Sequence, residues 1–423
     1  MQENLIAEIE ALGPRLKALF ETIAANTGDK PGITRAAFGS SETAAAESIS
    51  EFARSEGLKS SFNRVGNLEI VDDRQADLQD EIIIGSHIDS VPHGGNYDGL
   101  AGVIAGLAVL AAFRRTNTQT KFRIKTIGFR CEESPWFGPA YIGSKLQLGL
   151  LKRGDLDILT RFDTGQTLAS HLGAIGVIVD DSIAQPVSSL SGIRAYLELH
   201  IEQASLLETE KVPVGIATAV RGNIRFPFAR CIGSHAHSGA VPRHLRRDAV
   251  LATAKLLAHA DFVWSELIEN GNQDLVFTCG IFQTNPHEHA MTKVPGEVNF
   301  SLNIGGTDDA VMEYLYSSIA KRADELQVEH GVEFRFGDRV GTSAVKLDMH
   351  LQQAATEAAR DLNLTTRSMP TVGHDAAMYS KQGIPSSVLL MRNSNGSHNP
   401  DEHLEMSDFV MGLKILAETV LTI

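Results

Sequence analysis

The sequence is poor in cysteine. It has three in 423 residues, Cys131, Cys231 and Cys279, and no two of them form a Cys-x-x-Cys pair. Structural zinc sites of the thiolate type and disulfide frameworks both need paired or clustered cysteines. The widely spaced, odd-numbered set argues against both, and it fits reduced thiols in a cytoplasmic protein.

Positive charge and long apolar runs are also scarce. Lys and Arg number 38 against 52 Asp and Glu, which gives a formal net charge of -14. An acidic surface repels phosphates and anionic lipids, so we expect neither a nucleic acid nor a membrane as partner. The longest apolar stretch, 102–113, is shorter than the roughly 20 residues of a membrane span, and the N-terminus has no apolar run of the signal-peptide type. A cytoplasmic location is expected.

The first half of the chain alternates between strand-like and helix-like segments. We expect helices at 44–56 and 102–114, and strands at 81–86, 121–130 and 194–201. Strands interleaved with helices predict a three-layer α/β domain. Because 423 residues exceed one core of ordinary size, a second domain is expected as well.

The middle of the chain changes character. The expected order is strand, helix, two strands, helix and strand, over 224–232, 248–269, 276–282, 298–304, about 309–328 and 332–336. This order resembles the split βαβ, or ferredoxin-like, plan. We predict an inserted α+β domain at 212–328, with 1–211 and 329–423 forming the first domain.

The segment 85–102 reads GSHIDSVPHGGNYDGLAG. His87 follows a buried strand, where a side chain projects from the sheet edge into a crevice. The Asp89 carboxylate is suited to accept the other ring N–H of His87 and fix its tautomer. Asp98 lies in a Gly-rich turn before a helix, and its two oxygens suit it to bridging two cations. The turn is not a phosphate loop, since neither GxGxxG nor GxxxxGK followed by Ser or Thr is present.

Further acids and histidines follow other strands. Glu132 and Glu133 come directly after the strand at 121–130, and two adjacent carboxylates repel unless a cation neutralises them. One is then suited to bind metal and the other to act as a general base. His200 alternates with apolar residues in LELHIEQ and shares a strand face with Glu198. GHDAAM at 373–378 and SHNPDEH at 397–403 add three late histidines.

Each of these signals has an ordinary structural interpretation. A strand-end histidine is more often hydrogen-bonded within the fold, and adjacent glutamates more often lie in a solvated loop. Taken together, they supply hard or borderline ligands and no cysteine. That set suits Zn²⁺, Mn²⁺ or Co²⁺ rather than an iron–sulfur cluster.

The ordered motifs resemble a known family. GITRAAFGS at 32–40, the segment at 85–102, FRCEESPWFGPAYIGS, ELHIEQ, HSGAVP, VPGEV, GHDA and SHNPDE together span nearly the whole chain. They resemble the dinuclear metallopeptidase and amidohydrolase superfamily that includes carboxypeptidase G and aminoacylase. Within it, the sequence is most similar to the branch of allantoate amidohydrolase, N-carbamoyl-L-amino-acid hydrolase and β-ureidopropionase. The implied fold is a zinc-peptidase-like catalytic domain with an inserted lid and dimerisation domain.

The resemblance implies two divalent ions, Zn²⁺ or Mn²⁺, with Co²⁺ or Ni²⁺ as alternatives. Asp98 would bridge both ions. His87 and His200 would complete one site. Glu133 and His398 would complete the other.

The resemblance also implies catalytic and substrate-binding roles. Glu132 would be the base that takes a proton from the bridging water, and Asp89 would orient His87. His237, from the inserted domain, would point at the scissile carbonyl. The expected pocket residues are Gln203, Arg225 and His374. A homodimer through the inserted domain and a small-molecule substrate are implied as well.

The sequence departs from the family pattern at three places. PNAxNVVPG is usual before the last lid strands, and HEHAMTKVPG stands here. An Arg that clamps the substrate carboxylate usually ends the following strand, and Gly305 falls at that position. Glycine cannot replace an Arg–carboxylate fork, so a free α-carboxylate on the substrate is in question. Trp136, after Glu133, either packs in the core or lines a pocket for a flatter substrate.

The sequence is therefore compatible with three functions. Hydrolysis of an N-carbamoyl (ureido) or related linear amide is favoured. An aminoacylase-like or peptidase-like hydrolase, acting on another C–N bond without a free α-carboxylate, is the alternative. A non-catalytic metal-binding relative is disfavoured, because neither Glu132 nor any expected ligand is missing.

Overall fold

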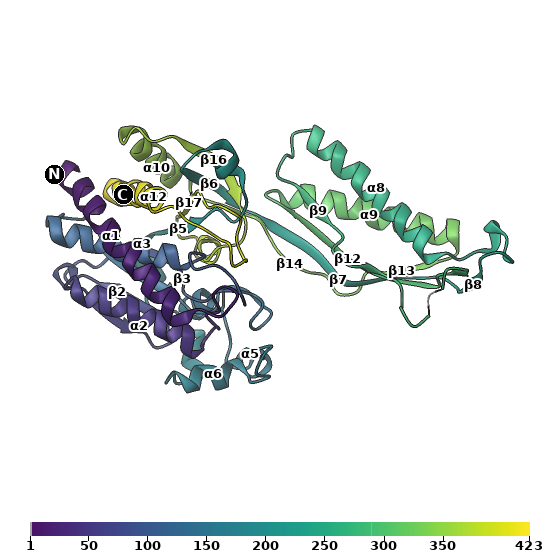
Figure 1. Ribbon diagram of the computed structural model, residues 1–423, viewed down its shortest axis with the longest axis horizontal. Helices are drawn as coiled ribbons and strands as arrows, with labels where there is room; N and C mark the ends of the chain where they lie inside the picture. The colour runs from purple at the N-terminus through teal and green to yellow at the C-terminus, as the bar shows by residue number, and fades with distance from the viewer. Residues whose placement is uncertain (1, 289) are drawn as a thin grey trace. The chain divides into compact units, whose positions relative to one another are not determined.

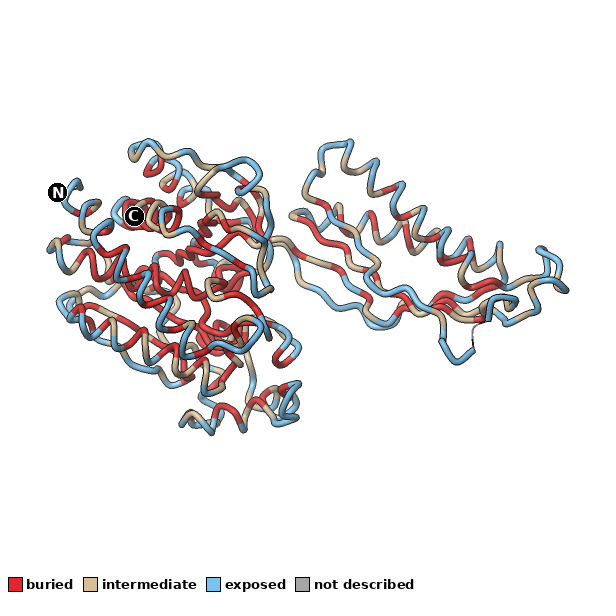
Figure 2. The backbone as a smooth tube through the Cα atoms, viewed as in Figure 1, coloured by how far each residue is buried: buried red, intermediate tan, exposed pale blue. Residues whose placement is uncertain are grey.

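The computed structural model describes residues 2–288 and 290–423, and the chain forms two compact units (Figure 1). The larger unit combines Met1–Thr218 with Leu347–Ile423. The smaller unit is Ala219–Lys346. In both units the buried residues gather along the strands and on the helix faces that pack against them (Figure 2).

The smaller unit begins and ends later than the predicted boundaries of 212 and 328. β6 (Val214–Val220) pairs with β17 (Ser386–Met391) in the sheet of the larger unit, so most of β6 belongs there. At the other end, β13 (Glu333–Arg335) and β14 (Val340–Thr342) both pair with β7 (Gly222–Ile232) of the smaller unit. Apolar alternation identifies a strand but does not say which sheet it joins.

A nine-stranded mixed sheet forms the centre of the larger unit. Its order is β1-β2-β4-β3-β5-β17-β6-β15, and β16 also pairs with β6. The remaining strands are β1 (Lys59–Phe62), β2 (Leu68–Val71), β3 (Glu81–His87), β4 (Arg123–Phe129), β5 (Ile193–Ile201), β15 (Val345–Lys346) and β16 (Thr366–Thr371). β4, β3, β5 and β17 run parallel to one another. Their carboxyl ends therefore meet along one edge of the sheet.

The sequences of these strands match their positions in the sheet. All seven residues of β3 are buried, as expected for a parallel strand covered on both faces. In β5, Leu197, Leu199 and Ile201 join the main apolar core. Tyr196 points to the opposite face, where its ring stacks on Tyr379 of α11 with the centroids 4.2 Å apart. The alternation expected in β5 therefore separates a core face from a polar face.

Helices cover the sheet of the larger unit. α1, α3 and α12 pack on one another, and α3 and α12 contact the central strands. α11 contacts β17 and β5 from the other face. The helices are α1 (Gln2–Thr27), α2 (Ser40–Ser55), α3 (Leu100–Thr116), α4 (Ile142–Gln147), α5 (Asp155–Ile158), α6 (Leu168–Ala174), α7 (Leu206–Glu210), α10 (Met349–Asp361), α11 (Ala376–Lys381) and α12 (Met406–Thr422). Short 3-10 helices lie at Asp73–Gln75, Asp181–Ala184, Leu190–Gly192 and, in the smaller unit, Arg243–Leu245.

The apolar stretch at 102–113 is buried within α3, as predicted. No helix among the described residues combines the length and apolar character that a membrane crossing requires.

The smaller unit is an antiparallel sheet with two long helices. Its main sheet has the order β10-β12-β7-β13, with β9 pairing with β12 and β14 with β7. Its other elements are β7 (Gly222–Ile232), β8 (Ala236–His237), α8 (Ala249–Glu269), β9 (Val276–Thr278), β10 (Phe282–Gln283), β11 (Lys293–Val294), β12 (Glu297–Gly306) and α9 (Asp309–His330). The main elements run strand, helix, strand, strand, helix, strand, which is the order of a split βαβ arrangement. The apolar sides of β7, β12, α8 and α9 share one core.

Candidate metal centre

The carboxyl ends of the parallel strands bring most of the predicted ligands together. His87 is the last residue of β3, and His200 lies one residue before the end of β5. Glu132 and Glu133 follow the end of β4. Asp98 lies in the turn before α3. An edge of this kind is where α/β proteins place their ligand sites.

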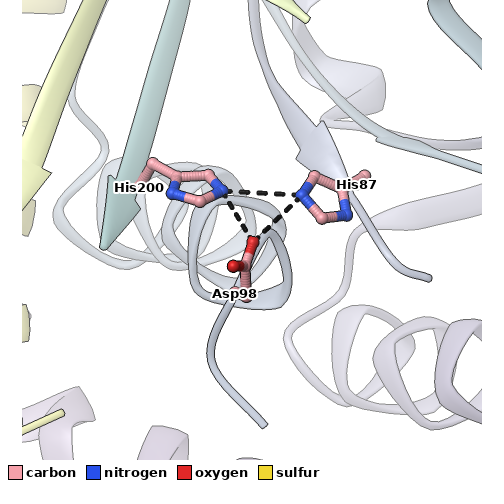
Figure 3. Close-up of side chains that lie close together, drawn as sticks. All are labelled: His87, Asp98 and His200. Atoms are coloured by element: carbon pink, nitrogen blue, oxygen red, sulfur yellow. Dashed lines mark hydrogen bonds and ion pairs between the residues drawn. The ribbon is translucent and has the colours of Figure 1, made fainter. Parts of the chain in front are cut away.

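Three buried side chains converge at this edge (Figure 3). Oδ1 of Asp98 lies 3.3 Å from Nε2 of His87 and 3.2 Å from Nε2 of His200. The two imidazole Nε2 atoms lie 3.5 Å apart. Each of the three side chains thus places one possible ligand atom in the same small space.

The other oxygen of Asp98 faces a second group of ligands. Oδ2 lies 3.5 Å from Nε2 of His398, and the same nitrogen lies 3.1 Å from Oε1 of Glu133. The contact with Glu133 raises the pKa of His398 to about 9. Asp98 is therefore shared by two groups that could each hold an ion.

The orientation of the two buried histidines suits a cation. Nδ1 of His200 lies 2.9 Å from the backbone oxygen of Ile201, and Nδ1 of His87 lies 3.1 Å from that of Asp89. A backbone oxygen only accepts, so each Nδ1 carries a proton, and in the neutral ring the lone pair lies on Nε2, close to Asp98. The backbone N–H of Gly99 donates to Nε2 of His200 at 3.1 Å. Oδ1 of Asp98 is buried and has no hydrogen-bond partner. Two imidazole lone pairs and an unpartnered carboxylate oxygen are the donor set of a zinc or manganese site.

The same donors shift the pKa values of these groups. Burial alone would lower the pKa of His87, but its contacts with Asp89 and Asp98 outweigh burial and raise the pKa well above its usual value. Burial alone would raise the pKa of Asp98, but the neighbouring His200 and His87 hold it well below its usual value.

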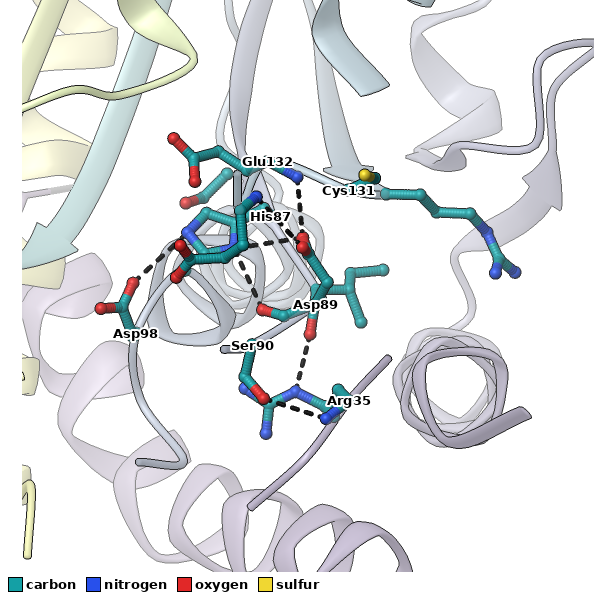
Figure 4. A network of polar contacts seen from close by, with 12 residues as sticks. Arg35, His87, Asp89, Ser90, Asp98, Cys131 and Glu132 are labelled. Carbon is teal, nitrogen blue, oxygen red and sulfur yellow. Dashed lines mark hydrogen bonds and ion pairs between the residues drawn. The ribbon is translucent and has the colours of Figure 1, made fainter. Parts of the chain in front are cut away.

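Asp89 lies between His87 and Glu132 (Figure 4), and it also contacts Glu133. Its Oδ1 lies 3.4 Å from Nδ1 of His87. The backbone N–H of Glu132 donates to Oδ1 at 2.9 Å, and that of Glu133 donates to Oδ2 at 3.1 Å. One buried carboxylate thus joins the loop after β3 to the loop after β4.

Glu132 is buried at the same edge of the sheet, and His87, Glu132 and Glu133 form a further group of close ligand atoms. Burial raises the pKa of Glu132 well above its usual value. The neighbouring His87 opposes this shift, and the negative charges of Glu133 and Asp375 add to it.

Two of the predicted pocket residues also lie at this centre. Nε2 of Gln203 donates to Oδ2 of Asp98 at 2.9 Å and lies 3.3 Å from Nε2 of His398. The ring of His374 lies 4.4 Å from that of His200. Burial, together with the neighbouring His200, lowers the pKa of His374 well below its usual value.

The other two predicted residues, His237 and Arg225, belong to the smaller unit. Nδ1 of His237 accepts a hydrogen bond from the backbone N–H of Gly239 at 3.1 Å, and the side chain is exposed. Nε of Arg225 donates to the side-chain oxygen of Asn303 at 2.9 Å. These partners all lie within the smaller unit, and the substrate contacts assigned to both residues stay predictions.

The structure accounts for the two unusual positions, Gly305 and Trp136. Gly305 lies in β12, and a Cβ atom there would meet Cγ2 of Val276 at 2.8 Å. Val276 therefore crowds the space that a side chain would need. Trp136 is buried in an apolar cluster, and its ring N–H donates to the backbone oxygen of Ser90 at 2.9 Å. Of the two interpretations of Trp136, the structure supports packing.

Sequence reasoning gave no role to three residues that contact the centre. Glu198 groups with His200 and His374. The hydroxyl of Ser397 contacts Asp98, and Glu402 accepts hydrogen bonds from the backbone before α3. The alternation in β5 already placed Glu198 on the face of His200, whereas nothing in the pattern SHNPDE distinguishes Glu402 from the adjacent Asp401.

Comparison with known proteins agrees with this geometry. An N-carbamoyl-L-amino-acid amidohydrolase of Pseudomonas sp. (strain NS671) is 28% identical, covering 99% of this chain and 98% of its own. An allantoate amidohydrolase of Bacillus subtilis (strain 168) is 28% identical, covering 92% of both chains. A solved structure of a hydantoinase/carbamoylase family amidase from Burkholderia multivorans superposes with a TM-score of 0.86 at 26% identity, covering 97% of both chains.

The model of peptidase family M20/M25/M40 matches residues 83–422. That range holds all five predicted ligands and most of both units. The resemblance found from the motifs is thus confirmed, and the chain belongs to peptidase family M20/M25/M40.

Proposed function

We propose that this protein is a metal-dependent amidohydrolase that cleaves a linear C–N bond in an N-carbamoyl (ureido) or related amide substrate. The observation that carries the proposal is the convergence of His87, His200 and His398 on the two oxygens of Asp98. The relatives named as N-carbamoyl-L-amino-acid and allantoate amidohydrolases support the substrate class.

Asp98 is the proposed bridge between two divalent ions, Zn²⁺ or Mn²⁺, with Co²⁺ or Ni²⁺ as alternatives. His87 and His200 would hold one ion. Glu133 and His398 would hold the other. When bound, such a pair lowers the pKa of a shared water and polarises the amide oxygen.

Glu132 is the proposed general base. Its raised pKa makes the carboxylate a stronger base than an exposed glutamate at neutral pH. It accepts the proton of the attacking water and later delivers that proton to the leaving nitrogen. Asp89 supports this step by accepting the backbone N–H of Glu132 and by contacting His87.

The remaining roles concern the substrate. His237 is proposed to stabilise the tetrahedral oxyanion, and the smaller unit to serve as lid and dimerisation domain of a cytoplasmic homodimer. Gln203 and His374 would contact the substrate beside the ions, and Arg225 would do so from the smaller unit. The position of Gln203 against Asp98 supports the first of these contacts.

A second candidate is an aminoacylase-like or peptidase-like hydrolase whose substrate lacks a free α-carboxylate. One specific observation favours it. Glycine stands at position 305 of β12, and a Cβ atom there would lie 2.8 Å from Cγ2 of Val276. An Arg–carboxylate fork at this place is therefore not available.

A product assay separates the two candidates. Chelator-treated protein is reloaded with Mn²⁺ or Zn²⁺ and given N-carbamoyl amino acids and allantoate, with release of ammonia measured, and acyl amides that carry no α-carboxylate, with the freed amine measured. Ammonia from the ureido compounds supports the first proposal. Turnover of the acyl compounds alone would replace it with the second.

A further inference from the structure

Arg35 is a buried cation that the proposed chemistry does not use. It lies in GITRAAFGS at 32–40, and its side chain is fully buried. Nε donates to the backbone oxygen of Ile88 at 2.6 Å. Nη1 and Nη2 donate to the side-chain and backbone oxygens of Asn96 at 3.1 and 3.3 Å. One planar guanidinium thus joins the two ends of the segment that runs from His87 to Asp98.

The backbone of Arg35 strengthens the same connection. Its N–H donates to the hydroxyl of Ser90 at 2.9 Å, and its oxygen accepts the N–H of Ser90 at 3.1 Å (Figure 4). Asn96 is held in turn, because its amide donates to the backbone oxygen of Phe20 in α1 at 3.0 Å. The segment 88–96 is therefore tied to two earlier parts of the chain.

Glu402 holds the other side of Asp98. Its Oε1 accepts the backbone N–H of Tyr97 at 2.8 Å and that of Asp98 at 3.2 Å. Its Oε2 accepts the hydroxyl of Ser397 at 2.9 Å, and the same hydroxyl contacts Oδ2 of Asp98. Ser397 immediately precedes His398. Glu402 therefore joins the turn of Asp98 to the loop of His398.

Gly95 makes the approach of Glu402 feasible. A Cβ atom at this position would lie 2.2 Å from the carboxylate of Glu402, which is far inside contact distance. The Gly-rich turn is therefore needed for the close packing of a buried acid, and not for a phosphate. This gives the glycine a structural reason that the sequence pattern left open.

We propose that Arg35 and Glu402 are positioning residues for the metal centre. Arg35, through Asn96, and Glu402, through the N–H groups of Tyr97 and Asp98, hold the turn that carries the shared ligand. Together they set the place of the Asp98 carboxylate relative to His87 and His398. This inference rests on the proposed function, because it assigns the two residues to that same metal site.

Geometry and charge make different predictions for Arg35. Its planar guanidinium donates to Ile88 and Asn96 at the same time. A lysine ammonium carries the same charge but lacks this planar set of N–H donors. If Arg35 positions the turn, Arg35→Lys should lose most of the metal affinity that Arg35→Met loses. If Arg35 acts only as a compensating charge, Arg35→Lys should keep the metal affinity of the wild type.

The control is Lys125, a buried cation of β4. Lys125 pairs with Glu81 at 2.8 Å, and both side chains are buried. Glu81 begins β3 and His87 ends it. Lys125→Met therefore disrupts a buried ion pair of the larger unit at the end of β3 remote from the ligands.

The test titrates Mn²⁺ into chelator-treated full-length protein by calorimetry. The variants are Arg35→Met, Arg35→Lys, Glu402→Gln and Lys125→Met. Visible absorption of the Co²⁺-loaded proteins reports ligand geometry, and circular dichroism confirms that each variant folds. Residues that orient metal ligands typically contribute about 10–100-fold to metal affinity. We expect a loss of that size and a shifted Co²⁺ spectrum in both Arg35 variants and in Glu402→Gln, and wild-type behaviour in Lys125→Met.

Each outcome decides between the proposals. A wild-type protein that binds no Mn²⁺ would refute the proposed metal centre itself. Wild-type binding together with an Arg35→Lys variant of unchanged affinity and spectrum would overturn the positioning role of Arg35. An equal loss in Lys125→Met would show a general effect of destabilisation. If an Arg35 variant does not fold, the nearly isosteric Glu402→Gln still tests whether the turn of Asp98 is held from that side.

Discussion

Replacing Asp89 with asparagine tests how the two halves of the centre are joined. The carboxylate accepts the backbone N–H groups of Glu132 and Glu133 at 2.9 and 3.1 Å, one on each oxygen. An asparagine has one oxygen, so its amide nitrogen would face one of these two N–H donors. One hydrogen bond is then lost, and the other no longer has a charged acceptor.

The magnitude follows from those two changes. A hydrogen bond to a charged group contributes about 1.5–3 kcal/mol, and a neutral one about 0.5–1.5 kcal/mol. Losing one charged bond and weakening the second should lower the free energy of unfolding of the metal-free protein by about 2–4 kcal/mol. Because Asp89 also contacts His87, the affinity for Mn²⁺ should fall by about 10–100-fold as well.

Urea unfolding of chelator-treated protein measures the first effect, and calorimetric titration of Mn²⁺ measures the second. Asp248→Asn is the matched control. Asp248 begins α8 and its side chain accepts one N–H, that of Leu251, at 3.0 Å. Asparagine caps helices as well as aspartate does, so this variant should change stability by less than about 0.5 kcal/mol. An Asp89→Asn variant as stable as this control would refute the reasoning.

Three further predictions address the base, the smaller unit and pH. Glu132→Gln should lower kcat by about 10²–10⁴-fold with the bound metal unchanged in elemental analysis, and loss of metal would mean that the two glutamates have exchanged roles. His237→Ala should lower the rate without changing Mn²⁺ affinity, and wild-type turnover would remove this residue from the mechanism. Burial raises the pKa of Glu42 to about 7 from 4.5, so its ionisation weakens folding as pH rises between these values. Glu42→Gln should therefore flatten the pH dependence of the unfolding free energy over that range by about 3 kcal/mol, and an unchanged slope would contradict the shift.

Much of the centre could be predicted from the sequence because the ligands follow regular elements. The apolar run at 81–86 predicts a strand that His87 follows, and His87 is the last residue of β3. The alternation in LELHIEQ predicts that His200 lies on the polar face of β5. Parallel strands with aligned carboxyl ends then bring such residues together. Local patterns and one rule of topology therefore predicted that these side chains meet, whereas the division of the ligands between two ions came from the resemblance to the family.

Other features depend on contacts between distant segments, which local patterns do not encode. Arg35 and Glu402 act on one turn from positions 367 residues apart (402 − 35), and no spacing rule connects them. The end of the smaller unit was misplaced for the same reason, since pairing of β13 and β14 with β7 joins segments about 100 residues apart in sequence. The crowding of Gly305 by Val276 likewise appears only when β9 is seen beside β12.

Backbone conformation shows how firmly the surrounding contacts hold the ligand loops. Cys131 and His398 both have left-handed backbone angles, with φ of 58° and 60°, which residues with a side chain rarely adopt. Each such position disfavours the folded state by roughly 1 kcal/mol or more, so neighbouring contacts must outweigh that preference.

At Cys131 those contacts are visible. Its N–H donates to the buried carboxylate of Glu42 at 3.2 Å, and its oxygen accepts the N–H of Ile142 at 2.8 Å. The reversal at this residue lets the next two N–H groups both point at Asp89. Glu42 therefore acts on the loop after β4 as Glu402 acts on the turn before α3. The ligands come from strand ends, but their mutual geometry is set by buried acids and one arginine that bind backbone groups rather than metal.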